Sequence, residues 1–272
     1  MREITYTVRR LVARHQGALP VILTCPHGGD AQPPGVAKER TGIGLPSSCR
    51  FTLTTDRLTR TITRGVAQAL FDVFGEAPYV VFANFDRKYI DANRSNESAK
   101  CAFEDPDAQE FYDEYHNTIR GFVDEIRADS GGLGLLFDIH GTDGAPGDQA
   151  DIFLGTRDGD SISALLRRDP LAMSRARSLP GALRAAGYVL SSRTPETLPG
   201  DFTLKAYGSS NPDGVDAVQV EIESALRIDE IKRQAFIDDL AYAMSNLIAR
   251  YGDSQALSVF RTAGFLPRLR RG

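Results

Sequence analysis

The stretch Val21-Ile-Leu-Thr-Cys-Pro-His-Gly-Gly-Asp30 decides the fold, because its short apolar run ends at a proline and places a histidine in a glycine turn. A run of this length, bounded by Pro20 and Pro26, is typical of a buried strand. His27 then follows the carboxyl end of that strand, the edge at which open α/β sheets bind ligands. Asp30 adds a second ligand-type side chain. The residues alone also allow a plain turn histidine held by local hydrogen bonds.

Similar patterns recur along the rest of the chain. Apolar runs predict an edge strand at 4–8 and further strands at 79–82, 133–139, 152–154, 188–190 and 217–224. Apolar stripes at helical spacing, each preceded by capping residues, predict helices at about 58–73 and 111–126. Further helices are predicted at 161–168, at 179–187 and, capped by Asp229, at 229–250. Segments 31–50 and 191–214 are predicted to be loops. Strands that alternate with helices favour an α/β fold, with a mixed, mostly parallel sheet and helices on both faces.

The composition is that of an ordinary globular protein. We expect a single domain over residues 1–272, with a mobile basic tail from about 262. A formal charge of -4 offers no footprint for nucleic acid, and the sequence contains neither a signal-peptide pattern nor an apolar stretch that would span a membrane. A cytoplasmic location is therefore predicted. Cys25, Cys49 and Cys101 match no disulfide framework, so reduced, mostly structural thiols are expected.

Ionisable side chains stand at the ends of three predicted strands. They are His27 with Asp30, His140, and Glu221 with Glu223. Histidine nitrogens and carboxylate oxygens suit zinc, and a catalytic zinc keeps three protein ligands with a fourth position open for water. A spare glutamate then takes the proton from that water. Asp138 shares a strand face with His140 and is placed to orient its ring or to cap the following loop.

Four short motifs together carry a resemblance to a known family. In order along the chain they are Pro26-His-Gly-Gly29, Arg87 with Asp91-Ala-Asn-Arg94, Asp138-Ile-His-Gly141 and Val220-Glu-Ile222. This pattern resembles the N-formylglutamate amidohydrolase family and its uncharacterised relatives, over about residues 20–228. That family is similar in fold to the zinc carboxypeptidases, so the resemblance implies a phosphorylase/hydrolase-like α/β sandwich.

The resemblance implies a role for each matching residue. His27 and His140 would be ligands of one Zn²⁺ per chain, and Glu221 the general base. Asn93 and Arg94 would hold a substrate carboxylate, for which a guanidinium offers a bidentate fork, while Arg87 would polarise the scissile carbonyl. The alternative role of Arg94 is a salt bridge to Asp91 or to another nearby acid.

The third metal ligand stays open between two aspartates. Asp30 imitates the His-x-x-Glu spacing of carboxypeptidases, whereas Asp56 matches the acid that formylglutamate amidohydrolases tend to have at the start of the helix after the long loop. The alternative role of Asp56 is to cap that helix. Glycine at position 28, where those enzymes commonly have serine, and the residues after Glu221 depart from the family pattern, so the reaction type is better defined than the substrate.

The predicted function is that of a zinc-dependent hydrolase. It would cleave the amide bond of a small acidic N-acyl amino acid, N-formyl compounds among them, or of a similar carboxylate-bearing substrate, by means of metal-activated water. A non-catalytic carboxylate-binding protein on the same fold is the alternative from another class. A hydrolase that uses Cys25 and His27 is a further alternative, although Pro26 separates the two residues.

Overall fold

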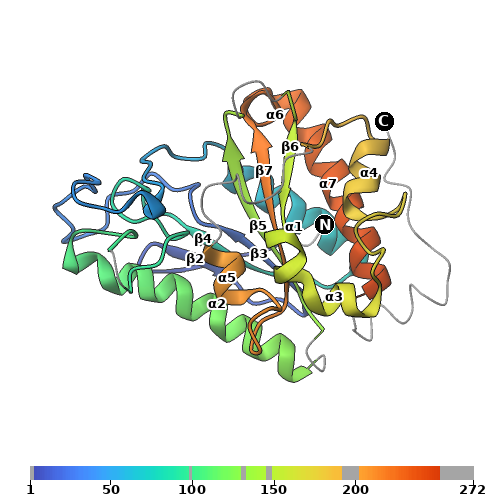
Figure 1. Ribbon diagram of the computed structural model, residues 1–272, viewed down its shortest axis with the longest axis horizontal. Coiled ribbons are helices and arrows are strands. Elements are labelled where there is room, and N and C mark those ends of the chain that lie inside the picture. The colour runs from blue at the N-terminus through green and yellow to red at the C-terminus, as the bar shows by residue number, and fades with distance from the viewer. Residues whose placement is uncertain (1–2, 98–99, 130–132, 145–148, 192–201, 252–272) are drawn as a thin grey trace.

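Parallel strands form the centre of a mixed sheet, and antiparallel strands close both of its edges (Figure 1). The computed structural model describes residues 3–97, 100–129, 133–144, 149–191 and 202–251. In this part of the chain the strand order is β1-β2-β4-β3-β5-β7-β6, with β4, β3, β5 and β7 parallel. The strands are β1 Thr7–Arg9, β2 Val12–His15, β3 Leu19–Cys25, β4 Pro78–Ala83, β5 Leu135–Thr142, β6 Ile152–Gly155 and β7 Asp216–Glu223.

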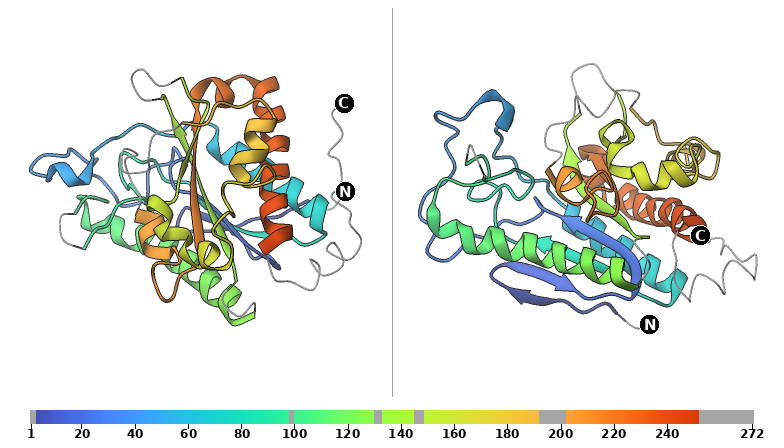
Figure 2. Two further views of the ribbon diagram at one scale, coloured as in Figure 1. Left: turned by 45° about the vertical axis from the view of Figure 1, so that its right-hand side comes forward. Right: turned by 60° about the horizontal axis from the view of Figure 1, so that its bottom comes forward.

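Helices cover both faces of this sheet (Figure 2). They are α1 Thr59–Phe74, α2 Gln109–Asp129, α3 Ser163–Arg168, α4 Leu179–Ala185, α5 Phe202–Tyr207, α6 Ser224–Ile228 and α7 Glu230–Tyr251. Short 3₁₀ helices lie at η1 Ser47–Cys49, η2 Pro106–Ala108 and η3 Arg157–Ile162. The predicted fold class, a mixed and mostly parallel sheet with helices on both faces, is confirmed.

The alternation of side chains along the strands divides the core into two clusters. Leu23, Phe137 and Val220 pack with α1, α4 and α7 on one face of the sheet. Ile22 and Leu136 belong to a second cluster, which packs against α2 and α5 on the other face. The central strands are therefore buried on both sides, as their near-continuous apolar sequences predict.

Some predicted elements differ from those in the structure. The edge strand at 4–8 is instead a short hairpin, in which β1 pairs antiparallel with β2. The strand at 188–190 is reduced to an isolated bridge between Ile152 and Leu190. The segment predicted as a loop at 191–214 contains α5, because Thr203, Leu204 and Tyr207 bury their side chains against the sheet. The predicted tail from 262 lies outside the described residues.

No helix in the described ranges combines the length and the apolar character that a membrane span needs.

Candidate metal centre

The carboxyl ends of β3, β5 and β7 bring the predicted strand-end residues to one edge of the sheet. Thr24 of β3 is paired with Asp138 of β5, which places His27, beyond the end of β3, beside His140. His140 in turn is the register partner of Glu221 in β7. The parallel register therefore joins segments that the sequence alone could not connect.

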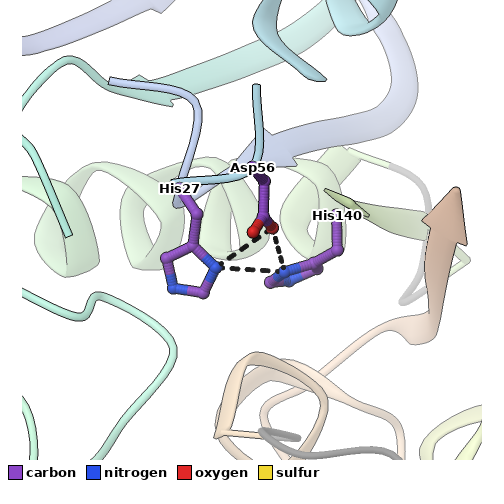
Figure 3. Close-up of side chains that lie close together, drawn as sticks. All are labelled: His27, Asp56 and His140. Carbon is purple, nitrogen blue, oxygen red and sulfur yellow. Dashed lines mark hydrogen bonds and ion pairs between the residues drawn. The ribbon is translucent and has the colours of Figure 1, made fainter. Parts of the chain in front are cut away.

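Three buried side chains converge on one point at this edge (Figure 3). His27 Nδ1 lies 3.2 Å from His140 Nδ1, and Asp56 Oδ2 lies 3.4 Å from the first nitrogen and 3.3 Å from the second. Ligand atoms about 2.0–2.1 Å from a tetrahedral zinc ion stand roughly 3.4 Å apart, as the geometry of a tetrahedron requires. The triangle of donor atoms thus has the dimensions of one face of a zinc coordination shell.

Each histidine also contacts a second carboxylate through Nε2, the ring nitrogen that is not part of the donor triangle. His27 Nε2 lies 2.7 Å from Asp91 Oδ1, and His140 Nε2 lies 2.8 Å from Asp138 Oδ2. Such contacts favour a proton on Nε2 and leave the lone pair of Nδ1 for a metal. Two imidazole lone pairs and a carboxylate that face one another repel unless a proton or a cation lies between them. The donor set therefore fits a divalent metal ion.

The loop before α1 places Asp56 beside His27 and His140. Asp56 donates its backbone N–H to His27 O at 3.0 Å, and its Oδ2 accepts the N–H of Gly141 at 3.0 Å. Helix α1 begins at Thr59 after Leu58, without a side-chain cap, so the alternative role of Asp56 as a helix cap is not what the structure has. Hydrogen bonds and charge from both histidines outweigh burial and hold the pKa of Asp56 well below its usual range.

Asp30 does not lie with His27, Asp56 and His140. After the glycine turn the chain pairs with the segment that follows β4, where Gly29 bridges to Asp86 and Asp30 donates its N–H to Asn84 O. This pairing leaves the Asp30 side chain exposed, outside the group of three. Of the two aspartates left open by the sequence, the structure brings only Asp56 to the histidines.

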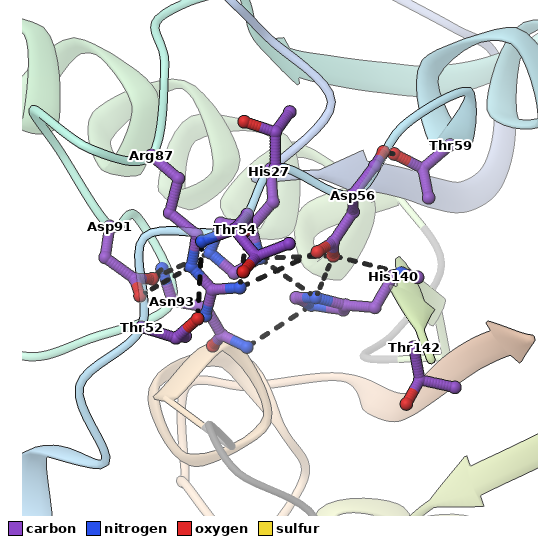
Figure 4. Close-up of polar contacts among 12 residues, drawn as sticks. His27, Thr52, Thr54, Asp56, Thr59, Arg87, Asp91, Asn93, His140 and Thr142 are labelled. Carbon is purple, nitrogen blue, oxygen red and sulfur yellow. Dashed lines mark hydrogen bonds and ion pairs between the residues drawn. The ribbon is translucent and has the colours of Figure 1, made fainter. Parts of the chain in front are cut away.

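Sequence reasoning missed the part played by Asp91. Its carboxylate is fully buried, and besides His27 it accepts a hydrogen bond from Arg87 Nε at 2.9 Å (Figure 4). Arg40 and Arg94 also place a guanidinium nitrogen 3.8 and 3.9 Å from it, the second being the predicted salt bridge. These charges, Arg87 first, overcome the effect of burial and hold the pKa of Asp91 well below its usual range. The sequence motif alone does not show that Asp91 is buried beside three arginines.

Asn93 and Arg94 are both bonded within the protein. Arg94 donates to the carbonyls of Cys49, Asn93 and Arg50 at 2.6, 2.8 and 2.9 Å, which ties the long loop to its own segment. The Asn93 side chain lies between His140 Nε2, at 3.2 Å from its Nδ2, and Thr203, whose N–H donates to its Oδ1 at 2.9 Å. Their predicted contact with a substrate carboxylate stays a prediction.

Glu221 stands beside His140 as a buried carboxyl group. Its Oε1 accepts a hydrogen bond from Gln219 Nε2 at 2.7 Å. Burial raises the pKa of Glu221 to about 7, close to the value that suits a general base at neutral pH. Glu223, the other acid of this strand, caps α6 by accepting the N–H of Ala225, so it has a structural role.

The cysteines differ from their prediction. Cys49 and Cys101, expected as reduced thiols, form a disulfide with their Cα atoms 5.4 Å apart, because the fold lays the loop before α1 against the segment before η2. Disulfides are more typical of oxidising compartments, so this bond does not support the predicted cytoplasmic location. Cys25 is free and fully buried, and burial raises the pKa of its thiol to about 11. This environment disfavours the thiolate that a Cys25/His27 hydrolase needs.

Comparison with known protein families tests the resemblance inferred from the four motifs. Residues 104–227 match the N-formylglutamate amidohydrolase family. The resemblance expected from the motifs is thus confirmed, and the match indicates a hydrolase of the amidohydrolase type. His140 and Glu221 fall inside the matched range, whereas His27 and Asp56 precede it.

Two solved structures share the fold. The gene product Atu2144 from Agrobacterium tumefaciens is 19% identical with a TM-score of 0.60, and the alignment covers 89% of this chain and 96% of that one. The N-formylglutamate amidohydrolase from Ralstonia eutropha JMP134 is 17% identical with a TM-score of 0.55, covering 87% and 98%. At such identities the likeness concerns the fold alone. No curated protein matches this chain in sequence.

Proposed function

We propose that this protein is a zinc-dependent amidohydrolase, which cleaves the amide bond of an N-acyl amino acid or a similar carboxylate-bearing substrate. The observation that carries the proposal is the triangle of His27 Nδ1, His140 Nδ1 and Asp56 Oδ2, with sides of 3.2–3.4 Å. These three residues would hold one zinc ion per chain. When bound, the ion would supply Lewis-acid polarisation and lower the pKa of a water molecule at its open position to about 7.

Glu221 is the proposed general base. Its carboxyl group is buried next to His140 along the sheet, and its pKa of about 7 lets it accept a proton and return it at neutral pH. The hydrogen bond from Gln219 fixes one carboxyl oxygen, which limits the orientations that the group adopts. In the catalytic cycle, Glu221 would take the proton of the attacking water and pass it to the departing nitrogen.

Arg87 is the proposed electrophilic group for the scissile carbonyl. Its guanidinium lies 3.6 Å from Asp56 Oδ1 through Nη1, and its Nε is fixed by Asp91. A buried guanidinium held by two carboxylates keeps its charge and its direction, both of which help to stabilise an oxygen that becomes negative in the transition state. Asn93 and Arg94 border the same place, so they remain the proposed contacts of the substrate carboxylate.

The charge balance of the site favours an acidic substrate. The buried side chains of Arg40, Arg87 and Arg94 offset the carboxylates of the three aspartates Asp56, Asp91 and Asp138. A divalent ion adds two positive charges, so the site stays positive even when Glu221 is ionised. A positive, buried site attracts anions and raises their local concentration.

The proposed function is tested by a screen of zinc-loaded protein against N-acyl amino acids with acidic, neutral and basic side chains. We expect hydrolysis of acidic members, loss of activity on chelation, and its return with zinc. The variant His27→Ala/His140→Ala should bind no zinc at this site. Full retention of one zinc per chain in this variant would refute the metal site. Zinc bound at one per chain without any hydrolysis would instead support a non-catalytic carboxylate-binding protein.

A further inference from the structure

A cavity that contains none of the three proposed metal ligands lies between α2 and α5. Its volume is about 600 Å³, and α2, α5 and the segment 95–97 form its walls. Figures 1 and 2 show α5 lying over α2 on the same face of the sheet. Ligand sites for small molecules commonly have volumes of about 300–1,000 Å³, so the cavity has the size of a binding site.

The charges of this cavity are separated along its length. On α2, Asp113 and Arg120 stand one turn before and one turn after His116, and all three line the cavity. Glu97 adds a second acid near Asp113, and Lys205 of α5 adds a second cation near Arg120, whose Nη2 donates to the neighbouring Ala206 O. One end is therefore acidic and the other basic.

The middle of the cavity is aromatic and carries no charge. The ring of His116 lies between Tyr112, Phe202 and Tyr207, with ring centroids 4.3, 5.4 and 6.0 Å away. Burial lowers the pKa of His116 to about 3, so the imidazole is neutral at physiological pH. Its Nδ1 is fixed by the hydroxyl of Tyr207 at 2.8 Å. Flat rings in this arrangement suit an apolar or planar group, such as a side chain or a peptide bond.

Several polar groups of the cavity have no partner within the described part of the chain. Lys205 and Glu97 are exposed, and neither forms an ion pair there. The side-chain Oδ1 of Asn96 is buried without a hydrogen bond among the same residues. A buried oxygen that lacks a donor is costly, and an N–H group of a ligand would satisfy it. The exposed charges of Lys205 and Glu97 are therefore available to an anion and a cation, and the buried oxygen of Asn96 to an amide-like donor.

We propose that this cavity binds a zwitterionic, peptide-like molecule of about three residues. Its ammonium group would lie between Glu97 and Asp113, its middle against His116, and its carboxylate at Lys205 and Arg120. Asp113 and Arg120 are seven positions apart, which corresponds to a rise of about 10 Å along the helix. An extended chain of three residues spans about the same distance.

The cavity is connected to the metal group through Asn93. The side-chain Nδ2 of Asn93 lies 3.2 Å from His140 Nε2, and its Oδ1 accepts hydrogen bonds from the N–H and the hydroxyl of Thr203. Thr203 follows Phe202, which lines the cavity, and Ser95 lines it from the other segment. The bound molecule is thus either an extension of the substrate or a separate effector.

The proposal is tested with metal-free protein, so the result does not depend on hydrolysis or on zinc. The probe is the tripeptide Gly-Phe-Gly with free ends, compared by calorimetry with its C-terminal amide, its N-acetyl form and the doubly blocked form. Each blocked end should weaken binding roughly three- to ten-fold, as loss of a charge-assisted contact does. Binding of the doubly blocked form as tight as that of the free peptide, or no binding of any form at millimolar concentration, would overturn the proposal.

Substitutions at the two ends of the cavity test which charged end of the peptide binds at each. Lys205→Gln should weaken the free peptide about as much as amidation does, and amidation should have no further effect in that variant. Glu97→Gln should remove the effect of N-acetylation in the same way. Lys232→Gln, a change to an exposed lysine in the first turn of α7, is the matched control and should change nothing. Unchanged affinity in both cavity variants would contradict the assignment.

Competition identifies the source of the ligand. A tripeptide that competes with an N-acyl substrate for the zinc-loaded enzyme would mark the cavity as part of the substrate site. A tripeptide that binds together with the substrate would mark it as an effector site.

Discussion

Asp138 holds His140 by a 2.8 Å contact between its Oδ2 and His140 Nε2, and the other ring nitrogen of His140 then faces Asp56 and His27. In the metal-free protein, burial disfavours the charged imidazole. The charges and hydrogen bonds of Asp138 and Asp56 outweigh burial and hold the pKa of His140 well above its usual value. The metal-free protein therefore favours the protonated form of His140, and a metal ion that binds Nδ1 must displace that proton. Zinc affinity should therefore fall as the pH is lowered.

Asp138→Asn should reduce the number of protons released when zinc binds. An asparagine keeps the shape of the side chain but removes the negative charge, so the pKa of His140 falls and less of it carries a proton at pH 7. Calorimetry of zinc binding in buffers of different ionisation enthalpy measures this number. Asp30→Asn, at the exposed aspartate, is the control and should release as many protons as the unchanged protein. Equal release from Asp138→Asn would show that His140 is not the group displaced.

Asp56→Ala should weaken zinc binding by more than the roughly 10- to 100-fold that loss of an outer-shell partner costs, because it removes a ligand atom. Asp30→Ala should leave zinc binding unchanged, since the side chain is exposed outside the group. Metal content after dialysis against a zinc buffer measures both, and circular dichroism verifies that each variant is folded. A zinc-free Asp30→Ala protein would reverse the assignment of the third ligand.

Turnover should rise with pH to a plateau, because Glu221 accepts a proton only when it is ionised. The inflection should lie at or below about 7, since a nearby divalent ion favours the ionised form. Gln219→Met removes a hydrogen bond that stabilises the carboxylate, so it should move the inflection to higher pH. Glu221→Gln should retain zinc and lose turnover. An unshifted profile in Gln219→Met, or full activity in Glu221→Gln, would exclude Glu221 as the base.

Cys49→Ser/Cys101→Ser should lower the free energy of unfolding by about 4 kcal/mol at most, the loop-closure contribution expected for a cross-link of this span. The disulfide joins residues 52 positions apart. Urea unfolding with and without a thiol reductant measures the effect. The reductant should destabilise the unchanged protein to the level of the double variant and have no effect on the variant itself. Equal stability of all four samples would mean that the bond contributes nothing in solution.

The sheet was predictable because its central strands are apolar on both faces. Runs such as Val21–Cys25 and Leu133–Ile139 have few alternatives to burial, so the local pattern decides their structure. The short elements were less predictable. α5 forms in a polar segment because Leu204 and Tyr207 find a place in the core on one side of the sheet, which is a tertiary effect.

The site was predicted as far as strand ends determine it. His27, His140 and Glu221 follow from the edge at which parallel strands meet, and the contact between Asp138 and His140 follows from their shared strand face. Asp56 and the Cys49–Cys101 pair depend on how the long loop folds back, and no periodicity in the sequence encodes that path.

The three donor atoms of the metal group come from the end of β3, from the loop before α1 and from β5, so they meet only in the folded chain. An ion that binds there and not to the unfolded protein adds its binding free energy to folding, about 4 kcal/mol at a thousand times its dissociation constant. The thermal stability of any preparation would thus depend on its zinc supply. A melting curve recorded against free zinc concentration would report the affinity of the site even before a substrate is known.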